Sequence, residues 1–301
     1  MNFNFILAES NVPWVNEYKA LYFRELTKLG HTCNSIQYES LSDLNGDNWV
    51  IFGHWKEYQN SLRYKKSYRS IMQSNGTSAN PFIYQVDPNQ ELIDLSSVDV
   101  NLTAHPSHTK AIADKFRVSN VYTAGFPVEI PTLPIRKKKN TFVIAGRLSP
   151  DKNIYLAVFA LLKYCKYEKI TICYQHYTSS ELKNYPIESW KDLNIEFKQC
   201  DRLEYLNILA ESEYYVNFSL GDTSSVSAIE SFLCGCYPLL MDFGSEIMIP
   251  YYSKFIDYPI PINAIAAIKW ITEMKPEQNI KADLFNPLIC AQTLVRICES
   301  W

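Results

Sequence analysis

Two short segments of the chain contain residues that could bind a diphosphate and a sugar diol. The first segment is GRLSPDKN, residues 146–153, between a predicted buried strand and a predicted helix. Arginine can hold phosphate oxygens through two parallel hydrogen bonds, lysine adds a point charge, and the first amides of a helix attract anions. Arg147, Lys152 and the helix start therefore suit a diphosphate.

The second segment is DTSSVSAIE, residues 222–230, which follows the predicted strand EYYVNF and enters a helix. Glu230 lies inside that helix near Ile229 and Phe232, which are expected in the core. A carboxylate there can accept two hydrogen bonds from a vicinal diol such as ribose, and the amides of residues 224–226 can bind phosphate. Taken alone, each segment is more typical of a solvated helix surface.

The elements that must position these segments alternate between strands and helices along the chain. The first half has predicted strands at 3–8, 34–38, 49–52, 81–86 and 98–103, and predicted helices at 15–30 and 62–73. The second half has predicted strands at 141–146, 169–175, 194–199, 213–218 and 237–242, and predicted helices at 153–164, 203–210, 225–234 and 289–298. This α/β alternation predicts parallel sheets covered on both faces.

A linker with three prolines and the run RKKK, residues 127–140, separates the halves. We predict two tandem, doubly wound, Rossmann-like domains. The first comprises residues 1–134 and the second comprises residues 135–301. Ligands of such domains bind at the carboxyl ends of the strands.

The composition narrows the class of protein. With 301 residues, 47% of them hydrophobic and a fifth charged, the chain is typical of a globular protein and not of a disordered or fibrous one. Its net charge of −3 argues against binding nucleic acid with the whole surface. The start has no basic leader and no stretch is long and apolar enough to span a membrane, so a cytoplasmic location is expected. The eight cysteines have neither zinc-site nor disulfide-framework spacing.

Together, the two segments resemble the retaining glycosyltransferases of the GT-B fold in family four, also called group 1. That family has GRL…K, then E-x7-E, then a G-x-P turn into a hydrophobic strand. The matching positions are Gly146, Arg147, Lys152, Glu230, Gly235 and Pro238. Asp222 stands where the family has its first Glu. The resemblance implies two Rossmann-like domains facing across a cleft, with residues 1–134 on the acceptor side and residues 135–301 binding the nucleotide-sugar. It also implies that the last helix, about residues 287–301, crosses back to the first domain.

The resemblance also implies a nucleotide-sugar donor, UDP-glucose being the commonest in the family, and no further cofactor. Arg147 and Lys152 would bind the diphosphate and stabilise the charge on the leaving nucleotide without a metal ion. The absence of a DxD motif agrees with that. Glu230 would hold the ribose hydroxyls. The other expected donor contacts are Gly146, Gln199, Cys200, Leu203, Asp222, Thr223, Ser224, Ser225 and Val226, of which Gln199, Cys200 and Leu203 are placed near the base by topology.

On the acceptor side, Asp87 in PFIYQVDPN stands where the family has a catalytic-region histidine. The YQ-x-D stretch is similar to one in the α-glucosyltransferases of T-even phages, which glucosylate hydroxymethylcytosine in DNA and need that Asp. Asp87 would then orient the acceptor hydroxyl or take its proton. The alternative is that Asp87 only forms a turn with the Pro and Asn after it.

Other acceptor-side candidates are His54, after the strand WVIF, and the basic residues of RYKKSYR: Arg63, Lys65, Lys66 and Arg69. His54 could bind the acceptor or act as a base, and a structural histidine is the alternative. The basic residues could bind phosphates of DNA, of a lipid-linked sugar or of a membrane surface. In the last case, the protein would contact the membrane peripherally. Most such runs are solvated helix faces.

The sequence therefore favours a metal-independent retaining glycosyltransferase, a hexosyltransferase acting on a bacterial surface glycan or glycolipid. A phage-type DNA glycosyltransferase acting on a hydroxymethylated base stays open. So does a nucleotide-sugar binding protein without transfer activity, because Asp222 replaces a Glu and the segment ESNVP, residues 9–13, replaces the family's Gly-Gly loop.

Overall fold

The computed structural model describes residues 1–6, 13–53, 55–73, 94–219, 225–241 and 285–301. The chain divides into two compact units. Unit 1 comprises Met1–Glu129 and Ala282–Trp301, and unit 2 comprises Ile130–Lys281.

Unit 1 is built on a six-stranded parallel sheet with the order β2-β1-β3-β4-β5-β6. Its central strands are buried on both faces, as in the run WVIF of β3, which explains their continuous apolar sequence. The strands are β1 (Asn2–Ile6), β2 (Thr32–Ile36), β3 (Trp49–Phe52), β4 (Arg69–Gln73), β5 (Val100–Thr103) and β6 (Val121–Thr123).

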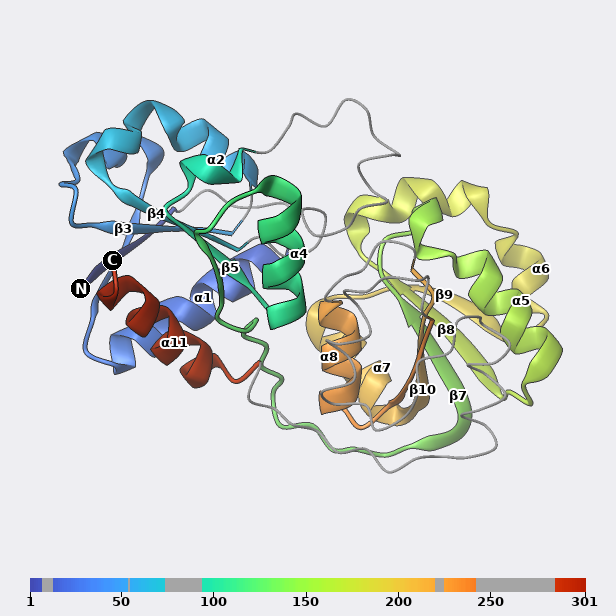
Figure 1. Ribbon diagram of the computed structural model, residues 1–301. Coiled ribbons are helices and arrows are strands. Elements are labelled where there is room, and N and C mark those ends of the chain that lie inside the picture. Colours follow the sequence, from blue (N-terminus) through green and yellow to red (C-terminus); the bar gives the residue numbers. More distant parts are fainter. Residues whose placement is uncertain (7–12, 54, 74–93, 220–224, 242–284) are drawn as a thin grey trace. The chain divides into compact units, whose positions relative to one another are not determined.

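The helices of unit 1 include one from the far end of the chain. Figure 1 shows α11 (Pro287–Glu299) beside α1 (Pro13–Lys28), and the two helices pack together. Cys290, Ala291 and Leu294 of α11 are fully buried. The other helices in the described part of unit 1 are η1 (Tyr38–Asp43), α2 (Trp55–Ser61), η2 (Leu62–Ser67), η4 (Leu95–Ser97) and α4 (Pro106–Phe116).

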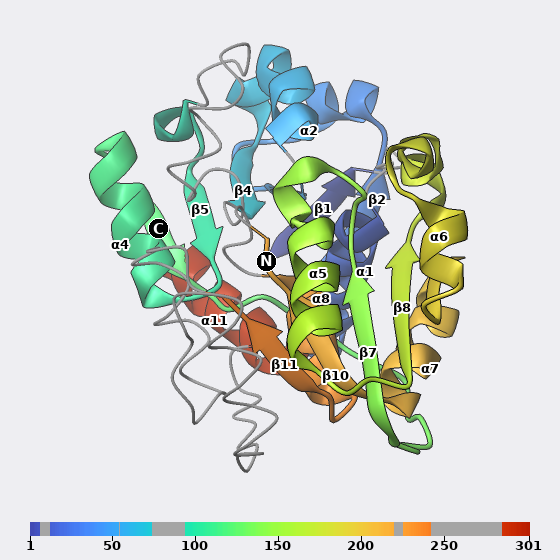
Figure 2. The ribbon, with the colours of Figure 1, turned by 90° about the vertical axis from the view of Figure 1, so that its right-hand side faces the viewer.

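Unit 2 contains a five-stranded parallel sheet with the order β11-β10-β7-β8-β9. Its strands are β7 (Lys138–Ala145), β8 (Lys169–Tyr174), β9 (Ile195–Gln199), β10 (Ser212–Asn217) and β11 (Tyr237–Leu240). The helices among its described residues are η5 (Pro150–Lys152), α5 (Ile154–Tyr164), η6 (His176–Asn184), α6 (Ile187–Lys191), α7 (Arg202–Glu211) and α8 (Val226–Leu233). Figures 1 and 2 show α5 on one face of this sheet and α8 on the other.

The strand order of unit 2 reverses direction at β7. The chain runs from β7 outward through β8 to β9, then returns to β10 and continues to β11. In doubly wound sheets, ligands bind outside the carboxyl ends of the strands at such a reversal. The loops after β7 and β10 flank this point, and they are the two segments that the sequence singles out.

One part of the predicted secondary structure is wrong. The stretch 62–73, predicted as a helix, forms the short 3₁₀ helix η2 and then strand β4, which pairs with β3 and β5. Four of the five β4 residues are buried, and pairing in the sheet outweighs the weak helical periodicity. The short strand β6 was not predicted. The predicted strand 81–86 lies outside the described residues.

Candidate functional site

The loop after β7 turns sharply at Gly146. Its φ of +142° is a conformation that L-residues rarely adopt, and it lets the chain leave the strand directly under Lys152. A Cβ at position 146 would lie 3.6 Å from Cε of Lys152. The lysine stem therefore runs over the glycine, as expected if both belong to one binding loop.

Two contacts join this loop to the end of β10. The ammonium of Lys152 lies 3.4 Å from Oγ of Ser219. Nδ2 of Asn153 donates to the carbonyl of Phe218 at 3.1 Å. Asn153 has a φ of +51° and is the N-cap of α5, so the same residue turns the chain and fixes the neighbouring loop. The two residues that directly follow β10, Phe218 and Ser219, are thus held against the loop after β7.

Leu148, the third residue of the loop after β7, is held by burial and by a hydrogen bond from Tyr185. Leu148 is buried, and its carbonyl accepts a hydrogen bond of 2.9 Å from the hydroxyl of Tyr185. Arg147, in contrast, has a half-exposed side chain whose Nη2 lies 3.2 Å from Oδ2 of Asp151. An exposed ion pair of this kind contributes little to stability, so the guanidinium can exchange it for a phosphate at small cost.

Glu230 is buried in α8, its side chain only 5% exposed. Burial raises the pKa of Glu230 to about 7, and the guanidinium of Arg202 acts in the opposite direction. Nη2 of Arg202 lies 3.1 Å from Oε1 of Glu230. A buried acid next to a helix start, with one oxygen on an arginine, can accept a hydroxyl hydrogen bond on the other oxygen.

The segment after β9, predicted to lie near the base, has mixed exposure. Gln199 is exposed, Cys200 is buried, and Leu203 is 56% exposed. Asp201 caps α7 by accepting from the amide of Glu204 at 2.8 Å. An exposed leucine at this edge offers an apolar surface for a ring.

The start of α8 also lies at the carboxyl edge of the sheet. Ser225 caps the helix through a hydrogen bond from the amide of Ala228 to its Oγ, at 3.3 Å, and Val226 is the first helical residue. The positive end of the helix is therefore directed to the edge where β10 ends. Five predicted site residues lie outside the described residues: His54, Asp87, Asp222, Thr223 and Ser224.

The carboxyl edge of the unit 1 sheet has a buried ion pair. Nζ of Lys19 on α1 lies 2.7 Å from Oε1 of Glu57 on α2 and donates to the carbonyl of Ile6 at 3.1 Å. Oε2 of Glu57 accepts from the amide of Gly53 at 2.9 Å. The pair therefore fixes the ends of β1 and β3, the strands between which the order of this sheet reverses. The sequence analysis assigned no role to Lys19 or Glu57, because both lie in helices of mixed polarity, where a charged residue is ordinary.

The four predicted basic acceptor residues lie at the opposite edge of that sheet, where the strands begin. Arg69 is the first residue of β4, and its guanidinium lies 5.5 Å from the ring centre of Trp49. Lys65 forms an ion pair with Asp99. Arg63 and Lys66 are exposed. Their role in acceptor binding remains a prediction.

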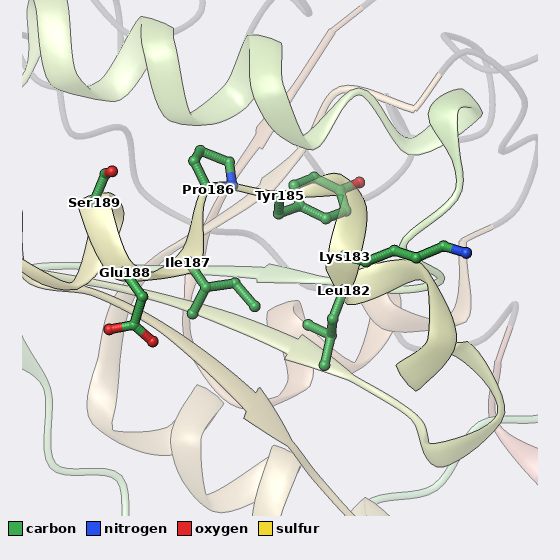
Figure 3. A pocket seen from close by; sticks show the side chains of 7 residues that line it. All are labelled: Leu182, Lys183, Tyr185, Pro186, Ile187, Glu188 and Ser189. Carbon is green, nitrogen blue, oxygen red and sulfur yellow. The ribbon is translucent and has the colours of Figure 1, made fainter.

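A shallow hollow of about 410 Å³ also lies in unit 2 (Figure 3). A single stretch of chain lines it, consisting of Leu182, Lys183, Tyr185, Pro186, Ile187, Glu188 and Ser189. It contains none of the predicted site residues. Among the described residues, no three metal-ligating side chains gather in a group, and no helix has both the length and the apolar character to cross a membrane.

Comparison with known proteins identifies the fold. No family profile and no curated protein sequence matches the chain. Among solved structures, Anabaena HepE in complex with UDP-glucose superposes with a TM-score of 0.69 at 10% identity, over 100% of both chains. The lipopolysaccharide outer core galactosyltransferase WaaB gives 0.68 at 11%, over 100% of this chain and 99% of WaaB. The chain has the GT-B fold.

A longer GT-B protein is also similar. Staphylococcus aureus TarM, in a complex that includes UDP, gives a TM-score of 0.63 at 16% identity. The match covers 87% of this chain and 54% of TarM, so the chain spans about half the length of that protein. A UDP-N-acetylglucosamine 2-epimerase from Rickettsia bellii gives 0.61 at 12% identity, so GT-B folds are not confined to transferases.

Proposed function

We propose that the chain is a glycosyltransferase that takes a sugar from a UDP-sugar and transfers it to an acceptor hydroxyl with retention of configuration. The observation that carries the proposal is the junction of the loops after β7 and β10, where Lys152 meets Ser219, with the buried acid Glu230 in the helix that follows β10. The fold shared with HepE and WaaB supports it. UDP-glucose is the proposed donor.

Each donor-side residue has a specific role in this proposal. Arg147 and Lys152 bind the diphosphate and stabilise the negative charge that develops on UDP as the glycosidic bond breaks, with no metal ion. The carboxylate of Glu230 accepts hydrogen bonds from the ribose hydroxyls. Asp222 and residues 223–226 contact the sugar and phosphates. Asp87 orients the acceptor hydroxyl or takes its proton.

The proposed acceptor is a glycan or glycolipid of a bacterial surface. The similar structure WaaB is a lipopolysaccharide outer core galactosyltransferase, and TarM has been crystallised with a glycosylated glycerol, α-GlcNAc-glycerol. A hydroxymethylated base in DNA is the alternative. Binding of the chain to double-stranded DNA that falls steeply between low and physiological salt would favour DNA, because each phosphate contact releases counterions.

The proposed activity can be tested against two other outcomes for the same site. The chain is incubated with UDP-glucose or UDP-N-acetylglucosamine and a panel of glycan, glycolipid and hydroxymethylated DNA acceptors. Release of UDP together with a glycosylated acceptor supports transfer, and proton NMR of the new anomeric centre reports retention. Conversion of the donor into its 2-epimer would indicate an epimerase. Tight UDP binding without any turnover would indicate a binding protein.

A further inference from the structure

Helices α7 and α8 pack side by side, and an ion pair connects them at the carboxyl edge of the unit 2 sheet. Arg202 is the first residue of α7 and follows the end of β9 by three residues. Its Nη2 lies 3.1 Å from Oε1 of Glu230 in α8. The guanidinium side chain is 35% exposed and the carboxylate side chain 5%, so the contact connects a buried acid to a cation that reaches solvent.

Arg202 affects how well the carboxylate of Glu230 can accept hydrogen bonds from a diol. Removing Arg202 would leave a buried carboxylate without this partner, and such a group takes up a proton instead of staying charged. A protonated carboxyl donates one hydrogen bond and loses acceptor capacity, so it is a poorer partner for two hydroxyl donors. Because the guanidinium contacts Oε1, Oε2 remains for a hydroxyl of a diol.

We propose that Arg202 is a positioning residue for the donor: it favours the charged form of Glu230 and orients the carboxylate so that it can accept hydrogen bonds from the ribose hydroxyls of UDP. This inference rests on the proposed function, in which Glu230 binds ribose. The ion pair also connects the part of the site predicted to contact the base with the part that binds ribose, because α7 begins at the segment predicted to contact the base. The ligand chemistry is a nucleoside diphosphate with an intact 2′,3′-diol.

The other titratable groups considered near Glu230 do not place a positive charge on its carboxylate. In the described part of the chain, Tyr205 of α7 and Cys234 next to the end of α8 interact electrostatically with Glu230. Burial raises the pKa of Tyr205 well above its ordinary value and that of Cys234 to about 12, so both are neutral near pH 7. Lys198 is nearby in sequence, but its Nζ lies 2.8 Å from Oε1 of Glu204.

The test measures UDP affinity by calorimetry from pH 6 to pH 9 for the wild type, Arg202→Met, Arg202→Lys and Lys198→Met. Lys198→Met is the matched control, because it removes a cation of the same segment that pairs with a surface acid. The wild type should bind more tightly as Glu230 loses its proton. Arg202→Met should bind about tenfold more weakly at pH 7. The pH midpoint of binding, at which half of the pH-dependent rise in UDP affinity is complete, should be higher in Arg202→Met by about one pH unit or more.

The two further variants separate charge from geometry. Arg202→Lys should keep the pH midpoint close to that of the wild type, because an ammonium supplies charge, and should recover only part of the affinity. Lys198→Met should behave as the wild type. The wild type should bind a second ligand, 2′-deoxy-UDP, about tenfold more weakly than UDP. In Arg202→Met the difference in affinity between the two ligands should be smaller.

A purely structural role for Arg202 would lower the melting temperature of Arg202→Met and leave its pH midpoint and its ribose discrimination unchanged, and that result would overturn the proposal. A wild type that binds no UDP between pH 6 and pH 9 would instead overturn the proposed function and this inference with it. The two failures are therefore distinguishable.

Discussion

Glu230 must satisfy two opposing demands. Burial makes its charged form costly and raises its pKa to about 7, yet the proposed contact with ribose needs the charged form. Arg202, 3.1 Å away, offsets part of that cost. A modest change of pH around neutrality should therefore alter both the stability of the ligand-free protein and its affinity for a donor.

The stability of unit 2 should fall as pH rises toward 7. Between the ordinary carboxyl pKa and about 7, folded Glu230 keeps a proton that the unfolded chain has lost. Stability then decreases by about 1.4 kcal/mol per pH unit across this window. Glu230→Gln should remove this component and should unfold at higher urea concentration than the wild type at pH 8.

Urea unfolding at pH 5, 6, 7 and 8 checks this prediction. Glu204→Gln, which removes a partly exposed acid paired with Lys198, is the control and should leave the pH slope unchanged. Equal slopes in wild type and Glu230→Gln would mean that Glu230 titrates in its ordinary range.

Lys152 should matter more for turnover than for binding. Its ammonium lies at the junction of the two loops, where the proposed mechanism has negative charge build up only as UDP leaves. Lys152→Met should lower kcat by about a hundredfold or more, with a smaller change in UDP affinity. Lys163→Met, at the exposed end of α5, should have no effect. A Lys152→Met variant with wild-type kcat in the transfer assay would remove Lys152 from the mechanism.

At the scale of elements, Asn153 connects the two loops that are proposed to bind the donor. Its φ of +51° suits Asn or Gly, and its side chain bonds the carbonyl of Phe218. Asn153→Ala should lose both features and cost about 1–3 kcal/mol. Asn153→Gly should restore the turn alone and recover part of the loss.

Chemical denaturation and UDP calorimetry on both Asn153 variants test this prediction. We expect weakened UDP binding in both, since neither fixes the loop after β10. If Asn153→Gly bound UDP as tightly as the wild type, the hydrogen bond to Phe218 would not be needed to shape the site.

The sequence predicted the strands of unit 2 well because they are buried on both faces and therefore largely apolar, as in β8 with five of six residues buried. It failed at β4, where a basic segment runs directly into a buried strand. The loops after β7 and β10 could be brought together by topology alone. The Arg202–Glu230 pair could not, because it depends on how α7 packs against α8.

At the scale of the whole molecule, unit 1 is completed by the last helix of the chain. Leu294 of α11 is fully buried, and this helix packs against α1. Leu294→Ala should destabilise unit 1 by about 2–5 kcal/mol through the cavity that it leaves. Its affinity for UDP should stay at the wild-type value, because the proposed nucleotide contacts all lie in unit 2.

Calorimetric melting of Leu294→Ala with and without UDP distinguishes the two units. UDP should raise the melting temperature of the variant as it does that of the wild type, since a ligand at a hundred times its Kd stabilises by about 2.7 kcal/mol. The control is Gln292→Ala, which truncates an exposed side chain of the same helix and should melt as the wild type does. A Leu294→Ala variant that has lost UDP binding while still folded would place part of the nucleotide site in unit 1.

The most direct test of the site is a crystal structure of the chain soaked with UDP. We expect the diphosphate against Arg147 and Lys152, and the ribose hydroxyls on the carboxylate of Glu230, at the carboxyl edge between β7 and β10. UDP bound elsewhere, or a saturating soak that leaves this edge empty, would contradict the proposed site.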